Sequence, residues 1–301
     1  MTRHYEVARQ RFCVSGAAEY FGLMENYEPF GCAEGETVFS LNIDRGEAPV
    51  YTEELRQMDD HLQIGASELS TTEKHAPKAE QEIVCGHTAS GEAVYGFLAQ
   101  GETAGWLVCS ADHHEGRLIT TGLHTKMAID NALMIIYAMA TADKATVLFH
   151  AAAVSFEDKG YLFLGPSGTG KSTHARLWLR YVAGTSLMND DNPVVGIGQD
   201  GTARVFGSPW SGKTPCYRNV KCPLGAIVVL SQAPANRIHR LSGIHAYAKL
   251  AESISGKRWD ARIADGLHQT QNLLASAIPV WHLECLPDEE AARLCNETIT
   301  R

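Results

Sequence analysis

The chain has 301 residues, of which 45% are hydrophobic and 20% are charged, a composition typical of a soluble globular protein with one large or two ordinary domains. The formal net charge of -9 argues against a general nucleic-acid-binding protein, which normally carries a basic face. Its eight cysteines include no C-x-x-C pair and predict reduced thiols. The chain starts without the apolar run of a signal peptide and has no apolar run long enough to span a bilayer. We therefore expect a cytoplasmic protein with neither nucleic acid nor membrane as a partner.

Residues 1–123 are predicted to form a β-rich N-terminal domain. Short runs of β-branched and aromatic residues alternate with glycine-containing turns, a pattern typical of strands, at residues 37–43, 82–88, 93–99, 105–111 and 116–122. The polar stretch 65–82 is expected to be an exposed connection. The sequence assigns no chemistry to this half, which we expect to recognise an acceptor or to mediate assembly.

Residues 124–301 are predicted to form a second domain of mixed α/β or α+β type. Apolar residues at helical spacing predict a helix within 124–144. Strands are then expected at 145–154, 160–165, 186–190, 193–198, 203–207 and 225–231, with a helix starting near residue 171. The end of the chain predicts helices at 243–255, 261–277 and 288–299 and a strand at 279–285. Such alternation is typical of a layered domain with its own core.

Two stretches satisfy the phosphate-binding pattern G-x-x-x-x-G-K-[ST], "GPSGTGKST" (Gly165 to Thr173) and "GSPWSGKT" (Gly207 to Thr214). A phosphate loop needs a buried strand before it and a helix after it, because free backbone N–H groups and the helix dipole must face the phosphates. The first stretch meets this demand, since an apolar strand precedes it and a proline-free apolar helix follows. We therefore predict that the first loop binds the nucleotide, through Gly165, Pro166, Ser167, Gly168, Thr169, Gly170, Lys171, Ser172 and Thr173.

The second stretch lacks that context, because Pro215 follows its Lys-Thr directly and Pro223 comes soon after. It is therefore not expected to be a second nucleotide loop. Two interpretations remain open: an ordinary surface turn, or a loop whose residues Ser211, Gly212 and Lys213 line the active site.

The other parts of a phosphoryl-transfer site can also be assigned. Lys171 is expected to reach the β- and γ-phosphates and the Ser172 hydroxyl to bind Mg²⁺. Asp190 and Asp191 follow a short predicted strand, one helix after the loop. One carboxylate can hold the metal while the other accepts the proton of an attacking hydroxyl.

The motifs "HAAAV", "GYLFLGPSGTGKST" and "NDDNPVV" together resemble the catalytic domain of HPr kinase/phosphorylase, whose wider relatives include the ATP-dependent phosphoenolpyruvate carboxykinases. The resemblance implies a P-loop kinase domain in which His150 lies near the phosphates. It also implies that Asp190 is the general base and that Asp191 assists with Mg²⁺.

The segment "SGKTPCYRNVKCPLGAIVVL" takes the place of an arginine-containing active-site loop in that family. The resemblance implies that Lys213 or Arg218 supplies positive charge to the phosphoryl group or the acceptor. The family's own loop sequence is not reproduced, and the analogy is closer to HPr-kinase-related proteins with other acceptors, some of them associated with peptide modification.

The leading interpretation is a kinase that uses ATP and Mg²⁺ to phosphorylate a hydroxyl of a protein, a peptide or a small molecule. An ATP-binding regulator or ATPase without phosphotransfer, and a carboxykinase-type lyase, are the alternatives. The sequence leaves open the acceptor, the choice between ATP and GTP, reverse phosphorolysis and the oligomeric state, a homo-oligomer included.

Overall fold

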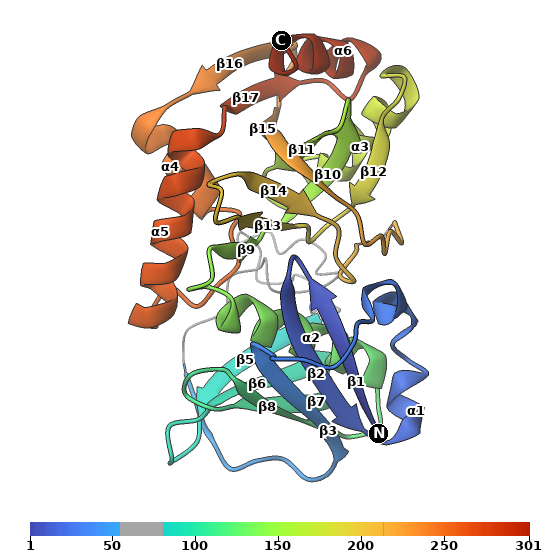
Figure 1. Cartoon of the computed structure of the whole chain (residues 1–301), viewed down its shortest axis with the longest axis vertical. Helices are drawn as coiled ribbons and strands as arrows, with labels where there is room; N and C mark the ends of the chain where they lie inside the picture. The colour runs from blue at the N-terminus through green and yellow to red at the C-terminus, as the bar shows by residue number, and fades with distance from the viewer. Residues whose placement is uncertain (55–80, 213) are drawn as a thin grey trace. The chain divides into compact units, whose positions relative to one another are not determined.

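The computed structural model describes residues 1–54, 81–212 and 214–301. Two compact units, Met1–Thr141 and Ala142–Arg301, make up the chain and are described in turn (Figure 1). Most of the predicted connection 65–82 lies outside the described residues, and so does Lys213.

Unit 1 is built on an eight-stranded sheet in the order β1-β2-β3-β8-β7-β6-β5-β4. Among the strands that the structure describes in this unit, only the β2–β3 and β3–β8 pairs are parallel. The strands are β1 (Thr2–Val7), β2 (Gln10–Gly16), β3 (Phe39–Arg45), β4 (Thr52–Glu53), β5 (Gln81–His87), β6 (Ala93–Ala99), β7 (Glu102–Cys109) and β8 (Glu115–Thr120). A short helix α1 (Ala18–Phe21) and a 3-10 helix η1 (Glu25–Phe30) join β2 to β3.

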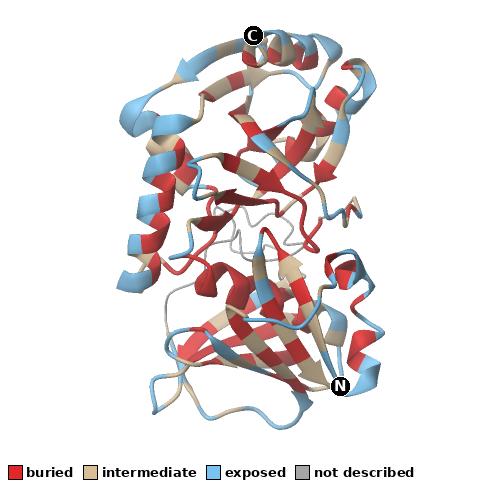
Figure 2. Cartoon of the chain, viewed as in Figure 1, coloured by how far each residue is buried: buried red, intermediate tan, exposed pale blue. Residues whose placement is uncertain are grey.

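The long helix α2 (Thr125–Ala140) packs against β3, β6, β7 and β8 and is buried over most of its length (Figure 2). Phe12 and Phe39 stack with ring centroids 4.9 Å apart, and the Tyr137 hydroxyl donates to the Val7 carbonyl at 3.0 Å. The helix predicted within 124–144 is therefore present, but its apolar face completes the core of unit 1. For this reason the units divide after Thr141, whereas the sequence placed the division at residue 123.

The hairpin β1–β2 lies in a segment where the sequence predicted no strand. Its two turn residues, Ala8 and Arg9, have φ values of 49° and 67°. Tight hairpin turns of this hand normally carry Asn or Gly, so the segment has no turn signal that a sequence reading could use.

Unit 2 contains a nine-stranded sheet with the path β12-β10-β11-β15-β14-β13-β9, extended by β17 and β16 beside β15. Its strands are β9 (Thr146–Leu148), β10 (Ala151–Phe156), β11 (Lys159–Leu164), β12 (Ser186–Asn189), β13 (Val194–Ile197), β14 (Ala203–Phe206), β15 (Lys221–Gln232), β16 (Arg237–Leu241) and β17 (Val280–Cys285). Its helices are α3 (Lys171–Tyr181), α4 (Gly243–Ala251), α5 (Ala261–Ala277) and α6 (Glu289–Ile299).

The fold class predicted from the sequence, a P-loop kinase domain of α/β type behind a β-rich domain, is wrong. The described chain forms two large mixed sheets with few helices, and in unit 2 only the pairs β11–β15 and β15–β17 are parallel. Most of the predicted strands of unit 2 are present, but the single strand predicted at 145–154 is divided into β9 and β10, and β16 was not predicted. Several neighbours, such as β10–β11 and β13–β14, are joined as antiparallel hairpins. A hairpin needs only a short turn, whereas a parallel connection needs a crossover that usually contains a helix. The connections within these hairpins therefore contain no helix.

The core nearest the first loop lies where α3 and α6 pack on the sheet. Trp178 of α3 contacts Tyr161 and Phe163 of β11, and Cys295 of α6 belongs to the same buried cluster. The burial of α3 fixes the start of this helix relative to the end of β11. Across the part of the chain that the structure describes, no helix is long and apolar enough to cross a membrane.

Candidate functional site

The first loop connects β11 to α3 with a turn at residues 165–170. Gly170 occupies the N-cap position of α3 with φ 108°, a conformation that favours glycine because a side chain is strained there. Among the described residues no side chain caps this helix, so its first amide groups remain available. A strand, a glycine turn and an uncapped helix start together form an anion-binding arrangement.

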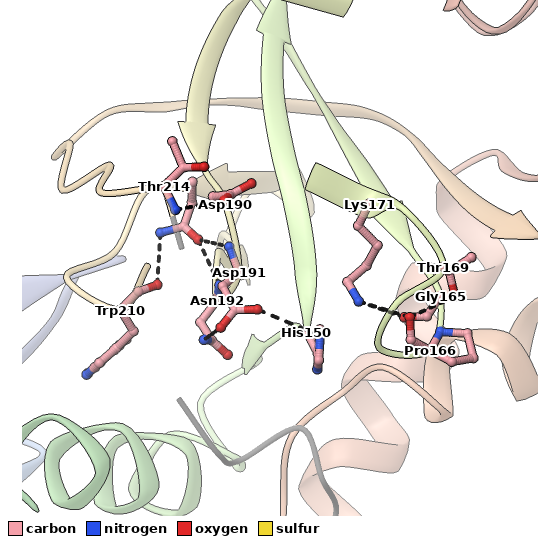
Figure 3. Close-up of polar contacts among 11 residues, drawn as sticks. His150, Gly165, Pro166, Thr169, Lys171, Asp190, Asp191, Asn192, Trp210 and Thr214 are labelled. Atoms are coloured by element: carbon pink, nitrogen blue, oxygen red, sulfur yellow. Dashed lines mark hydrogen bonds and ion pairs between the residues drawn. The ribbon is translucent and has the colours of Figure 1, made fainter. Parts of the chain in front are cut away.

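Lys171 is the first residue of α3 and is 7% exposed. Its Nζ donates to the carbonyl oxygens of Gly165 at 2.9 Å and Pro166 at 3.2 Å, as Figure 3 shows. Burial lowers the pKa of Lys171 to about 8, although the negative charges of Asp191 and Asp190 act in the opposite direction. The loop therefore holds a poorly solvated ammonium group that interacts electrostatically with both carboxyl groups.

Asp190 and Asp191 lie on the turn that follows β12, and Asn189 shapes this turn. The Asn189 side-chain oxygen accepts from the backbone N–H of Asp191 at 2.8 Å and of Asn192 at 2.7 Å. Its amide nitrogen donates to Ser208 Oγ at 3.1 Å and to the Trp210 carbonyl at 3.1 Å. Because Asn189 is fully buried, these bonds tie the acidic turn firmly to the second glycine stretch.

Asp191 lies between several charged and polar groups. Its Oδ1 is 3.7 Å from His150 Nε2, and its Oδ2 accepts from Asn192 Nδ2 at 2.9 Å (Figure 3). Burial raises the pKa of Asp191 to about 6; the charge of Lys171 lowers it and that of Asp190 raises it further. The backbone N–H of His150 is held by the Ser253 carbonyl at 2.8 Å, which fixes its position beside Asp191.

The second glycine stretch packs directly on the acidic pair. The backbone N–H of Thr214 donates to Asp190 Oδ2 at 3.2 Å. A Cβ on Gly212 would come within 3.0 Å of the Asp191 Cβ, so any side chain at this position displaces Asp191 or the loop. No helix follows Thr214, as the prolines predicted.

The structure brings Lys171, Asp190, Asp191 and His150 together, and it places the second stretch beside them. Arg218 is exposed, and its guanidinium donates to the Leu187 carbonyl on β12 at 2.6 Å. The structure does not describe Lys213, so the predicted roles of Lys213 and Arg218 stay predictions.

The residues predicted to hold Mg²⁺ are Ser172, half-buried in the first turn of α3, and Asp191. Within the described ranges no group of three or more His, Cys, Asp or Glu is arranged to hold a metal ion. Mg²⁺ in nucleotide sites is bound through one or two protein oxygens together with phosphates and water, so a hydroxyl and a carboxylate are a suitable donor set.

Asn189, Asn192 and Ser208 are parts of the site that the sequence analysis did not assign. Ser208 Oγ donates to the Asn192 carbonyl at 2.6 Å and so closes the network that Asn189 begins. The sequence does contain a local sign of Asn189 and Asn192: asparagines flank the acidic pair, and an Asn side chain readily bonds to backbone groups two residues on. Their partners in the second stretch come from a distant part of the chain, which no local pattern reveals.

The family described as SynChlorMet cassette protein ScmC matches residues 119–284, more than half of the chain. The chain therefore belongs to the ScmC family. The matched region contains both glycine stretches, the acidic pair and His150. No match was found among curated proteins.

Proposed function

We propose that this protein is a phosphotransferase that moves the γ-phosphoryl group of ATP to a hydroxyl of a protein, a peptide or a small molecule, with Mg²⁺ as cofactor. One observation carries the proposal. The buried ammonium of Lys171, at the start of an uncapped helix, interacts electrostatically with both Asp190 and Asp191. A phosphate-binding element and a pair of acids therefore act on the same small region.

The loop supplies the phosphate-binding part of this mechanism. The free amides at the start of α3 and the Lys171 ammonium stabilise the negative charge of the phosphates. Lys171 is released from the carbonyls of Gly165 and Pro166 when phosphate oxygens take their place. Because burial has removed most of the water around Lys171, this charge acts more strongly than it does in solvent.

The acidic pair supplies the acceptor-activating part. Asp190, held by the Thr214 amide, takes the proton of the acceptor hydroxyl as its oxygen bonds to the γ-phosphorus. The bond between the γ-phosphorus and the β–γ bridging oxygen breaks, and ADP leaves with that oxygen. We assign to His150, whose Nε2 is 3.7 Å from Asp191 Oδ1, the stabilisation of charge on the transferred group.

Asp191 and Ser172 are the residues that would hold Mg²⁺, which neutralises charge on the β- and γ-phosphates when bound. A cytoplasmic location is part of the proposal. The eight free cysteines and the use of ATP both suit a reducing cytoplasm.

The test follows the γ-phosphate label of ATP into protein and small-molecule fractions of a cell extract, with Mg²⁺ present. We expect the wild-type protein to label a discrete acceptor and Asp190→Asn to abolish labelling while ATP affinity stays within about twofold. The matched control is Asp200→Asn, an exposed acid paired with Arg204, which should label like wild type.

ATP binding without label transfer, together with an Asp190→Asn variant that behaves like wild type, would refute phosphotransfer and favour a nucleotide-dependent regulator. A decarboxylation product formed from oxaloacetate and ATP would instead identify a carboxykinase-type lyase.

A further inference from the structure

A cavity of about 690 Å³ adjoins the first loop at the ends of β15 and β17. One part of its wall is the loop itself, at Gly168, Thr169 and Gly170. Another part of the wall is apolar and includes Leu177, Leu230, Leu286 and Pro287. Its volume lies within the roughly 300–1,000 Å³ typical of small-molecule sites.

His174 of α3 contributes to this wall and is 2% exposed. Its Nε2 accepts a hydrogen bond from Trp178 Nε1 at 3.1 Å. An indole nitrogen can only donate, so the His174 ring is neutral and carries its proton on Nδ1. This Nδ1 is buried and has no partner among the described residues. A buried donor without an acceptor is destabilising, and a ligand oxygen or nitrogen that bonds to it relieves this cost.

We infer that this cavity binds the nucleoside part of the nucleotide, with the His174 Nδ1–H donating to an acceptor atom of the base or ribose. The inference rests on the proposed function, because it takes the first loop to hold the phosphates. The apolar wall suits the flat face of a purine, and the loop residues shared by cavity and phosphate site make the two continuous.

This placement also gives the nucleotide a direction. As far as the structure describes the chain, the cavity wall includes neither the acidic pair nor His150. With the nucleoside in the cavity and the loop beneath the phosphates, the terminal phosphoryl group faces Asp190 and Asp191. Ends of parallel strands beside a helix N-terminus are a common location for nucleotides, which agrees with this orientation.

The experiment compares binding of Mg-ATP, Mg-GTP and Mg-tripolyphosphate by calorimetry. Tripolyphosphate reports the phosphate loop alone. Ala233→Trp places a large ring in the cavity from a half-buried position, and His174→Phe removes the donor while keeping a ring. Leu273→Trp, on the exposed side of α5, is the matched control for adding a tryptophan.

We expect Ala233→Trp to weaken nucleotide binding at least tenfold and His174→Phe about fivefold, with tripolyphosphate affinity within twofold of wild type. Leu273→Trp should bind all three ligands normally. If thermal unfolding shows that His174→Phe is not folded, the result for Ala233→Trp decides the test alone.

Wild-type nucleotide affinity in Ala233→Trp, or equal loss of nucleotide and tripolyphosphate binding, overturns the inference but leaves the proposed function intact. If the wild-type protein binds neither the nucleotides nor tripolyphosphate, the proposed function is overturned, and the inference with it.

Discussion

The two glycine stretches share one sequence pattern but differ in the element that follows the lysine. After Lys171 the chain continues as an 11-residue helix whose first amides are uncapped. After Thr214 it meets Pro215 and runs to β15 without a helix. The first stretch therefore leaves N–H groups free at a helix start, and the second packs its backbone against Asp190 and Asp191.

This difference shows that the glycine pattern specifies a tight turn and not a ligand. Glycines allow a close backbone approach in both stretches. In the first, the approach serves a helix start with positive partial charge. In the second, it lets residue 212 lie against Asp191, where an added Cβ would be only 3.0 Å from the Asp191 Cβ and would push the two apart. The chemistry of each stretch depends on its neighbours.

The largest effect should come from exchanging the two lysines for alanine in turn. Lys171→Ala removes the charge that the proposed mechanism places on the phosphates, and we expect phosphoryl transfer to fall by about 100-fold or more. Lys213→Ala should cost about tenfold or less, since the second stretch has no helix behind it. Initial rates of label transfer at saturating ATP measure both.

Thermal unfolding of both variants is the control, because burial of the Lys171 charge itself opposes folding. Removing it should leave stability equal to or above that of wild type. A larger loss of transfer in Lys213→Ala than in Lys171→Ala would reverse the assignment of the two stretches.

The next effect concerns the bond network that joins the second stretch to the acidic turn. Asn189→Ala removes the side-chain oxygen that accepts from the N–H groups of Asp191 and Asn192, and the amide that donates to the Trp210 carbonyl, at a fully buried position. We expect the free energy of unfolding to fall by about 3 kcal/mol, measured by urea denaturation.

Asn272→Ala, at an exposed position of α5, is the matched control and should change stability by less than about 0.5 kcal/mol. If the two variants unfold alike, Asn189 does not hold the two segments together.

Local patterns were sufficient for most elements of the fold and insufficient for their arrangement. β11, α3, α5 and α6 appear where periodicity and turn residues placed them. The sheet order did not follow, because the pairing of β15 with β11, β14 and β17 depends on contacts between distant segments. The hairpin β1–β2 was missed for a different reason, since Ala8 and Arg9 adopt a conformation that their residue types disfavour.

The candidate site divides in the same way. The first loop was predictable because its strand, turn and helix are contiguous in sequence. The association of the second stretch with the acidic pair was left as one of two interpretations, and the buried asparagine that produces it was not assigned. The cavity wall combines residues from three separate segments, which a reading along the chain cannot assemble.

The smallest expected effect concerns Asp191, which the second stretch touches and on which the Lys171 charge acts. Its pKa is raised to about 6 in the folded protein, so between pH 4 and 6 the folded state binds more protons than the unfolded state. The stabilisation that comes from binding this proton in the folded state is present at low pH and is lost as the pH rises through 6. Asp191→Asn lacks this titration, so the variant should gain about 2 kcal/mol relative to wild type between pH 4 and pH 7.

Urea denaturation with EDTA present, across that pH range, measures the difference. Asp200→Asn is the matched control, because hydrogen bonds with Arg204 and Thr202 lower the pKa of Asp200 and place its titration below this window. Its stability relative to wild type should stay constant from pH 4 to pH 7. A constant difference in Asp191→Asn as well would mean that Asp191 is solvated like an ordinary surface acid. The packing of the second stretch would then not shield Asp191 from water.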